Sequence, residues 1–185
     1  NYANFIDLAR FIGIACVIYG HCHPFVGEAE ITIRNIVCCF HMPLSFLISG
    51  FLSKPIVNSG WGNYKKIVFS LFVPYIIYNI PYISLAFSNP FGFLCSMVTS
   101  SVPPNDPTWF FYALLWVKIL TTLFYRHQSL LLTGSMITYV SLLSCGIELN
   151  TIFCNHAILS GIIFFYFGKI YEQYSENRIM YVSIP

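Results

Sequence analysis

The 185-residue sequence has few charged side chains: Asp, Glu, Lys and Arg together make up 9% of it, against 57% hydrophobic residues. Soluble domains carry about 25% charged residues, so a soluble globular fold is disfavoured. The net charge is only +2 and the basic residues form no run, which argues against nucleic acid as a partner. The composition therefore predicts an integral membrane protein whose first partner is the lipid bilayer.

The sequence also lacks the short motifs of several common site types. Its seven cysteines are scattered and never form a CxxC pair, so no zinc or redox-disulfide motif is expected. It has no internal repeat of the kind that builds many secondary transporters. No basic region precedes the first apolar segment and no small-residue cleavage site follows it, so a cleavable signal peptide is not expected either.

Six stretches are long and apolar enough to cross a bilayer, since about 20 apolar residues span the hydrocarbon. They are residues 4–23, 31–52, 67–87, 108–125, 129–147 and 156–174. The stretch 89–101 is also apolar but contains Pro, Gly and Ser, and it is predicted to be an interfacial or re-entrant piece. The expected fold class is an all-α membrane protein with about six transmembrane helices, forming a single domain over residues 1–185.

Basic residues are distributed unevenly between alternate loops. With a cytoplasmic N-terminus, Arg34 is the one basic residue in the outer loops. The inner loops and tail then hold Lys54, Lys65, Lys66, Arg126 and Arg178. Because cytoplasmic loops are enriched in Lys and Arg, both termini are predicted to be cytoplasmic.

Three polar side chains occur in the first apolar segment, where a bilayer makes each of them costly. Asp7, Arg10 and His21 lie within about 60° of each other on one helix face. At ~1.5 Å rise per residue, Arg10 and His21 are roughly 16 Å apart along it. Asp7 and Arg10 are spaced for an ion pair, and His21 has the imidazole of a general base near neutral pH. A purely structural ion pair and a packing histidine remain alternatives.

Other polar and small residues occur at special places in the later segments. His41 lies beside Pro43, whose ring removes a helix hydrogen bond, and Ser49 with the glycine after it lets helices approach closely. Lys118 lies well inside the fourth segment, where a charge needs a partner or a ligand phosphate. Trp109 begins that segment, either as a binding residue or as an interfacial anchor.

No metal site is predicted. His21 and His23 point about 160° apart on a helix, so they share a metal only if the helix has ended. Haem ligation by His21, His41 and His156, which lie in different segments, is supported by no spacing.

Three blocks of the sequence resemble the membrane-bound acyltransferase 3 family. In the first, FIDLARFIGIACVIYGHCHPF, an Arg and a His are separated by ten residues, here Arg10 and His21. The second, FHMPLSFLISGFLSK at residues 40–54, is most similar to the branch that includes fucose 4-O-acetylase-like proteins. The third, PPNDPTWFFYALLW at residues 103–116, is similar to the family's Pro-x-Trp-Phe-Leu helix start.

The resemblance implies an enzyme that transfers an acyl group, commonly acetyl from acetyl-CoA as co-substrate, to a hydroxyl of a carbohydrate or glycolipid acceptor. It also implies a bacterial cytoplasmic membrane location. His21 would be the catalytic base or acyl-handling residue, and Arg10 would bind a CoA phosphate through its planar fork. His41 is a candidate hydrogen-bond donor to the developing oxyanion.

Lys118 and Trp109 are further candidates for binding acyl-CoA, and Asp7 and Ser49 are expected to support the site. Family members usually have about ten membrane helices, so this chain is expected to be a fragment, incomplete at its C-terminus. The alternatives are a transporter or flippase for a sugar or lipid-linked substrate, and an inactive truncated membrane fragment.

Overall fold

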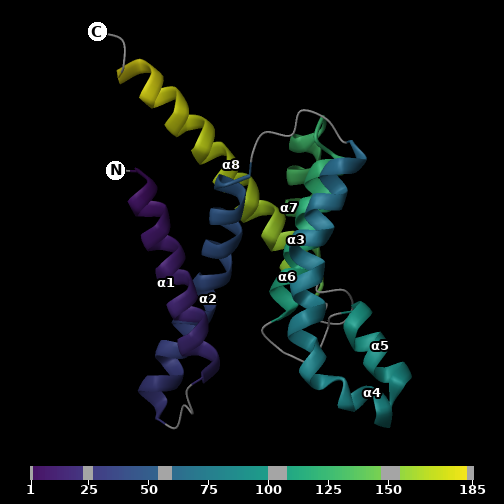
Figure 1. Cartoon of the computed structure of the whole chain (residues 1–185). Helices are drawn as coiled ribbons and strands as arrows, with labels where there is room; N and C mark the ends of the chain where they lie inside the picture. Colours follow the sequence, from purple (N-terminus) through teal and green to yellow (C-terminus); the bar gives the residue numbers. More distant parts are fainter. Residues whose placement is uncertain (1, 23–26, 54–59, 100–107, 147–154, 183–185) are drawn as a thin grey trace. The chain divides into compact units, whose positions relative to one another are not determined.

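A computed structural model describes residues 2–22, 27–53, 60–99, 108–146 and 155–182, and this part of the chain is helical without a strand (Figure 1). The all-α class predicted from the sequence is therefore confirmed. The helices are α1 (Tyr2–Cys22), α2 (Glu28–Phe51), α3 (Trp61–Asn79), α4 (Ser84–Ser88), α5 (Pro90–Thr99), α6 (Trp109–Leu123), α7 (Gln128–Ser144) and α8 (Asn155–Val182), with a short 3-10 helix, η1 (Ile80–Tyr82), after α3.

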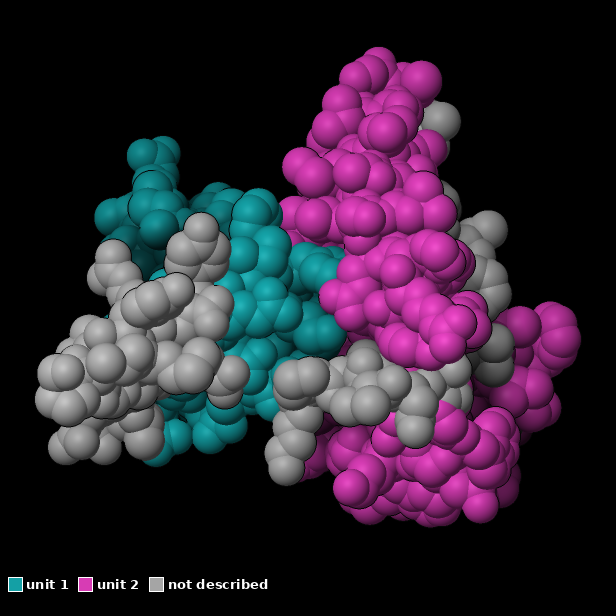
Figure 2. Space-filling model, turned by 90° about the horizontal axis from the view of Figure 1, so that it is seen from above, with its two compact units in different colours: residues 1–54, 164–185 teal, residues 55–163 magenta. Residues whose placement is uncertain are grey.

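The helices belong to two compact units, which Figure 2 distinguishes by colour. Unit 1 consists of residues 1–54 and 164–185, and unit 2 of residues 55–163. Each unit is described by itself below.

In unit 1, α1 and α2 pack side by side (Figure 1). A Cβ added to Gly20 would lie 3.7 Å from Cys38 Sγ, and one added to Gly13 would lie 4.0 Å from Ser45 Oγ. The two contacts run in opposite directions along the helices, so α1 and α2 are antiparallel, with residue 20 level with residue 38 and residue 13 level with residue 45.

The second crossing in unit 1 also depends on glycine. A Cβ on Gly50 of α2 would overlap the backbone carbonyl of Phe165 in α8, and a Cβ on Gly168 would overlap the backbone carbonyl of Leu47. The prediction that the Ser49-Gly50 pair permits close helix approach is confirmed, because only a residue without a side chain allows two backbones to come this near.

In unit 2, α3 and α6 form the central pair. Aromatic rings fill their interface: Tyr75 of α3 packs on Tyr112 of α6 with centroids 5.9 Å apart, and Tyr78 stacks on Phe111 at the same separation. Three of the most deeply buried core side chains of this unit, Tyr75, Ala113 and Val117, lie along this pair.

Four of the six predicted segments coincide with α1, α2, α6 and α7 to within three residues at each end, and α8 continues to Val182 rather than ending at residue 174. The third segment differs, because α3 ends at Asn79 and not at residue 87. Pro81 has no N–H for a further helix bond, and the side-chain amide of Asn79 already donates to the carbonyl of Tyr75. The chain turns through η1 and α4 instead.

The stretch predicted to be interfacial or re-entrant contains α5, which has ten residues and is too short to cross a bilayer. Asn89 caps it, since its Oδ1 accepts the Gly92 N–H at 2.8 Å and Pro90 occupies the first helical position. Judged by length and composition, α2 is the one helix of the described chain that is both long and apolar enough to span a membrane.

Candidate active site in unit 1

Helix α1 carries the predicted Asp7–Arg10 pair. Arg10 Nη1 donates a hydrogen bond to Asp7 Oδ1 at 3.2 Å. The side chains are 48% and 70% exposed, respectively. An ion pair this exposed contributes little to stability. The guanidinium is therefore oriented by Asp7 while its remaining N–H donors stay accessible.

His21 lies on the same helix, in its last turn, and is exposed. The antiparallel register places it beside the Gly20–Cys38 contact, whereas Arg10 is level with residue 48 of α2. Arg10 and His21 are thus eleven positions apart on one continuous helix, which corresponds to roughly 16 Å of helix rise.

His41 is the most deeply buried polar residue of the predicted set, with 2% of its surface exposed. Its Nδ1 lies 2.7 Å from the carbonyl oxygen of Val37. A carbonyl only accepts, so Nδ1 carries the hydrogen. Nε2 is buried and has no hydrogen-bond partner among the described residues.

The position of His41 relates it to His21. The register places His21 level with Val37, four residues or about 6 Å of helix rise from His41. The ring of His41 leans back toward Val37, as side chains on helices do. The two histidines therefore lie within about one helical turn of each other along the α1–α2 pair.

Ser49 lies further along α2. The register places it close to the level of Arg10, and its carbonyl accepts a 2.7 Å hydrogen bond from Ser53 Oγ. A cavity of about 610 Å³ opens between α1, α2 and α8 in this unit. Ala9, Ile48 and Tyr171 are among its apolar lining residues, whereas none of Arg10, His21 and His41 is among the described residues that line it.

Trp109 and Lys118 belong to unit 2. Trp109 is the first residue of α6, half-buried, and packs edge-on against Phe110. Lys118 is half-buried in the middle of α6, and no acidic side chain of the described residues forms an ion pair with it. The structure therefore gathers Asp7, Arg10, His21, His41 and Ser49 on one pair of helices, and leaves Trp109 and Lys118 on another unit.

The geometry of His156 does not support the alternative of haem ligation. Its Nε2 is hydrogen-bonded to the hydroxyl of Tyr139 at 2.9 Å. His23, the second residue of the metal alternative, lies outside the described residues.

The sequence did not predict a side-chain hydrogen bond in the core of unit 2. Asn79 Nδ2 donates to Thr108 Oγ1 at 3.0 Å, and both residues are buried. This hydrogen bond joins the end of α3 to the start of α6. An amide inside an apolar segment, just before Ile80-Pro81, is the signal that could have indicated it, since buried polar groups need partners.

Comparison with known proteins supports the resemblance seen in the motifs. A family model described as an acyltransferase domain matches residues 3–183, which cover both compact units. No curated protein and no solved structure gives a significant match. The match does not favour the transporter or flippase alternative. Because the family model covers nearly the whole chain, including the pair of helices that carries Arg10, His21 and His41, this chain belongs to the acyltransferase 3 family.

Proposed function

We propose that the protein is an integral membrane O-acyltransferase that moves an acetyl group from acetyl-CoA to a hydroxyl of a cell-surface carbohydrate or glycolipid. The observation that carries the proposal is the oriented Asp7–Arg10 pair on the helix that also carries His21. The fucose 4-O-acetylase-like branch is the one whose His-Met-Pro block this chain resembles most. With about six spans and cytoplasmic termini in a bacterial inner membrane, Arg10 would lie on the side where acyl-CoA is found.

Arg10 holds a CoA phosphate in this proposal. A guanidinium binds phosphate through two parallel hydrogen bonds, and Asp7 fixes its orientation before the ligand arrives. The pantetheine arm then follows α1 toward His21, roughly three turns away. Ser49, close to the level of Arg10, supports this end of a groove that is proposed to run along α1 from Arg10 to His21. Lys118 and Trp109 of α6 are further proposed residues for binding acyl-CoA.

His21 acts as the base of the transfer step. Its imidazole takes the proton of the acceptor hydroxyl while the oxygen attacks the thioester carbonyl. The new C–O ester bond forms, the C–S bond breaks, and the thiolate of CoA takes the proton from the imidazolium. Proton and charge therefore balance without a metal.

His41 forms the second polar wall, within about one helical turn of His21. Its Nδ1–H is already donated to Val37, so a neutral ring offers only the lone pair of Nε2. His41 donates to an oxyanion from Nε2 only as an imidazolium, and as a neutral ring it accepts a hydrogen bond instead.

Two substitutions in the full-length enzyme test the two roles separately. His21→Ala should lower the acetyl transfer rate by about 10²- to 10⁴-fold, the range of general-base catalysis, while acetyl-CoA binding is kept. Arg10→Ala should weaken acetyl-CoA binding by about 10- to 100-fold, the loss of a charge-assisted hydrogen bond. Transfer of radiolabelled acetyl to membrane glycan and calorimetric binding of acetyl-CoA measure the two quantities.

Arg34→Ala is a matched control, because Arg34 is a basic residue of α2 outside the proposed groove. Normal acetylation by His21→Ala would show that the base is wrongly assigned. Unchanged acetyl-CoA affinity in Arg10→Ala would rule out the phosphate role, and an unmodified glycan that is no longer exported on deletion of the gene would favour a transporter.

A further inference from the structure

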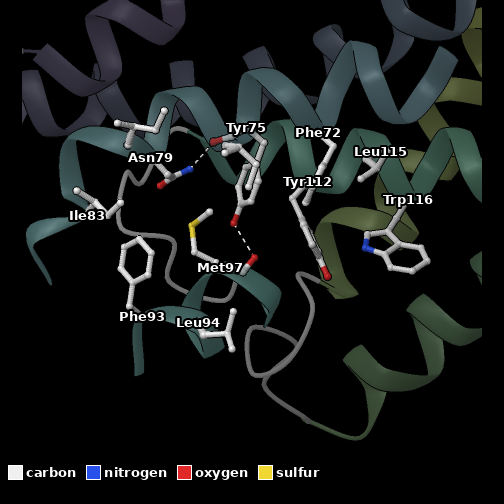
Figure 3. Close-up of a pocket in the computed structure, with 12 residues that line it drawn as sticks. Phe72, Tyr75, Asn79, Ile83, Phe93, Leu94, Met97, Tyr112, Leu115 and Trp116 are labelled. Atoms are coloured by element: carbon white, nitrogen blue, oxygen red, sulfur yellow. Dashed lines mark hydrogen bonds between the residues drawn. The ribbon is translucent and has the colours of Figure 1, made fainter. Parts of the chain in front are cut away.

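Unit 2 contains a second cavity, between α3, η1, α5 and α6 (Figure 3). Its volume is about 480 Å³, within the range of about 300–1,000 Å³ typical of small-molecule sites. Its floor is buried, since Tyr75, Tyr112 and Leu115 are at most 7% exposed. Phe93, Leu94 and Met97 of α5 lie opposite this floor (Figure 3).

Two polar side chains that line this cavity, those of Tyr75 and Asn79, form hydrogen bonds within the protein. The hydroxyl of Tyr75 donates to the carbonyl of Met97 at 2.8 Å, and this carbonyl belongs to the last turn of α5 (Figure 3). The amide of Asn79 donates to the carbonyl of Tyr75 at 2.8 Å and to Thr108 Oγ1. Among the described residues, the lining contains no charged side chain. The cavity therefore suits a ligand made of hydrocarbon and offers little to a polar one.

The cavity is elongated along α3. Its lining residues on this side are Phe72, Tyr75, Ile76, Asn79, Ile80 and Ile83, a spacing that forms one stripe on a helix. The first four of them, from Phe72 to Asn79, extend roughly 10 Å along α3 at 1.5 Å per residue, and the lining continues through η1 to Ile83. One leaflet of a bilayer has a hydrocarbon thickness of about 15 Å. The lining with its continuation is thus of the same order of length as a single lipid chain.

We propose that this cavity is a binding site for one acyl chain of a bilayer lipid. The charged headgroup stays outside, because no lining residue in the described part of the chain carries a charge that could pair with it. Two apolar side chains of α5 are largely exposed, Phe91 at 76% and the lining residue Leu94 at 60%, so the chain enters from the hydrocarbon side beside α5. A lipid in this place would hold the short helix α5 against the α3–α6 pair.

Photolabelling in nanodiscs tests the proposal without using acyl transfer, so it is independent of the proposed enzymatic function. The probe is a phosphatidylglycerol with a diazirine near the end of one acyl chain, at low mole fraction. Adducts mapped by mass spectrometry should concentrate on Met97, Leu94 and Ile76. Ile76→Trp fills the cavity with a larger side chain. The acyl chain then has no room, and labelling of α5 should fall about tenfold.

Ile77→Trp is the matched control, since Ile77 is the next residue of α3, 55% exposed and outside the lining. It should leave labelling unchanged. Leu115→Phe provides a second, milder filling of the floor if Ile76→Trp does not fold. Three results would each overturn the assignment to a bilayer lipid. The adducts could be spread evenly over exposed residues, the filled and control variants could be labelled equally, or palmitoyl-CoA could displace the lipid probe.

Discussion

His41 is deeply buried, and its Nε2 has no hydrogen-bond partner in the part of the chain that the structure describes. This combination lowers stability. A buried polar atom without a partner lowers stability by about 1–3 kcal/mol. The hydrogen bond from Nδ1 to Val37 raises the stability by only about 0.5–1.5 kcal/mol. A residue retained at a net cost to the fold, within about one helical turn of His21, is expected to serve the reaction.

His41→Leu tests this at the residue scale. The substitution removes both the bond and the unpartnered Nε2, so the melting temperature of the purified protein should stay the same or rise. The acetyl transfer rate should fall about 10²-fold if Nε2 contacts the reacting groups.

Ser45→Ala is the control for His41→Leu. Its hydroxyl donates a hydrogen bond to the backbone carbonyl of His41 at 2.8 Å, and not to the imidazole ring. Ser45→Ala should have near-normal activity. A melting temperature that drops by several degrees in His41→Leu, with normal transfer, would assign His41 to packing.

At the scale of elements, the crossing of α2 and α8 depends on two backbones that touch. Gly50 and Gly168 occupy the crossing from opposite sides. Helices in membranes associate mainly through such close packing, because the lipid is as apolar as the side chains. The crossing is therefore intolerant of even one added methyl group.

Gly50→Ala and Gly168→Ala should each lower the free energy of unfolding by about 1–3 kcal/mol, the cost of overpacking. Gly134→Ala in α7 adds the same methyl group where no heavy atom lies within 4 Å, and it should stabilise by about 0.5–1 kcal/mol because glycine disfavours helix. Thermal unfolding in detergent measures all three. Equal effects at the three positions would contradict the close crossing.

At the scale of the whole molecule, the proposed topology places the end of α7 outside. Cys145 follows α7, is exposed and forms no disulfide within the described part of the chain. In a variant that retains Cys145 alone, a membrane-impermeant maleimide should therefore react in intact cells. Gln128→Cys in a cysteine-free background, at the other end of α7, should react only after permeabilisation. The reverse pattern would invert the orientation derived from the basic residues.

The third segment shows where prediction from sequence reached its limit. Hydropathy continues without a break from Ile67 to Phe87, although α3 ends at Asn79. Pro81 alone does not decide this, since Pro74 lies within α3 without ending it. The additional cause is the bond from Asn79 to Thr108, a contact across 29 residues that no local pattern contains.

The sequence by itself determined the helical class, the polar residues of α1 and the family, because composition, helical spacing and motifs are local properties. Only the tertiary structure decided which faces meet. Helices that are apolar all round carry little contrast between a buried and an exposed face. Periodicity therefore did not predict that α8 is the helix that crosses α2 at Gly50, that Nε2 of His41 has no partner among the described residues, or that a cavity lies beside α5. These depend on where backbones cross, and the crossing distance is set by side chains from distant segments together.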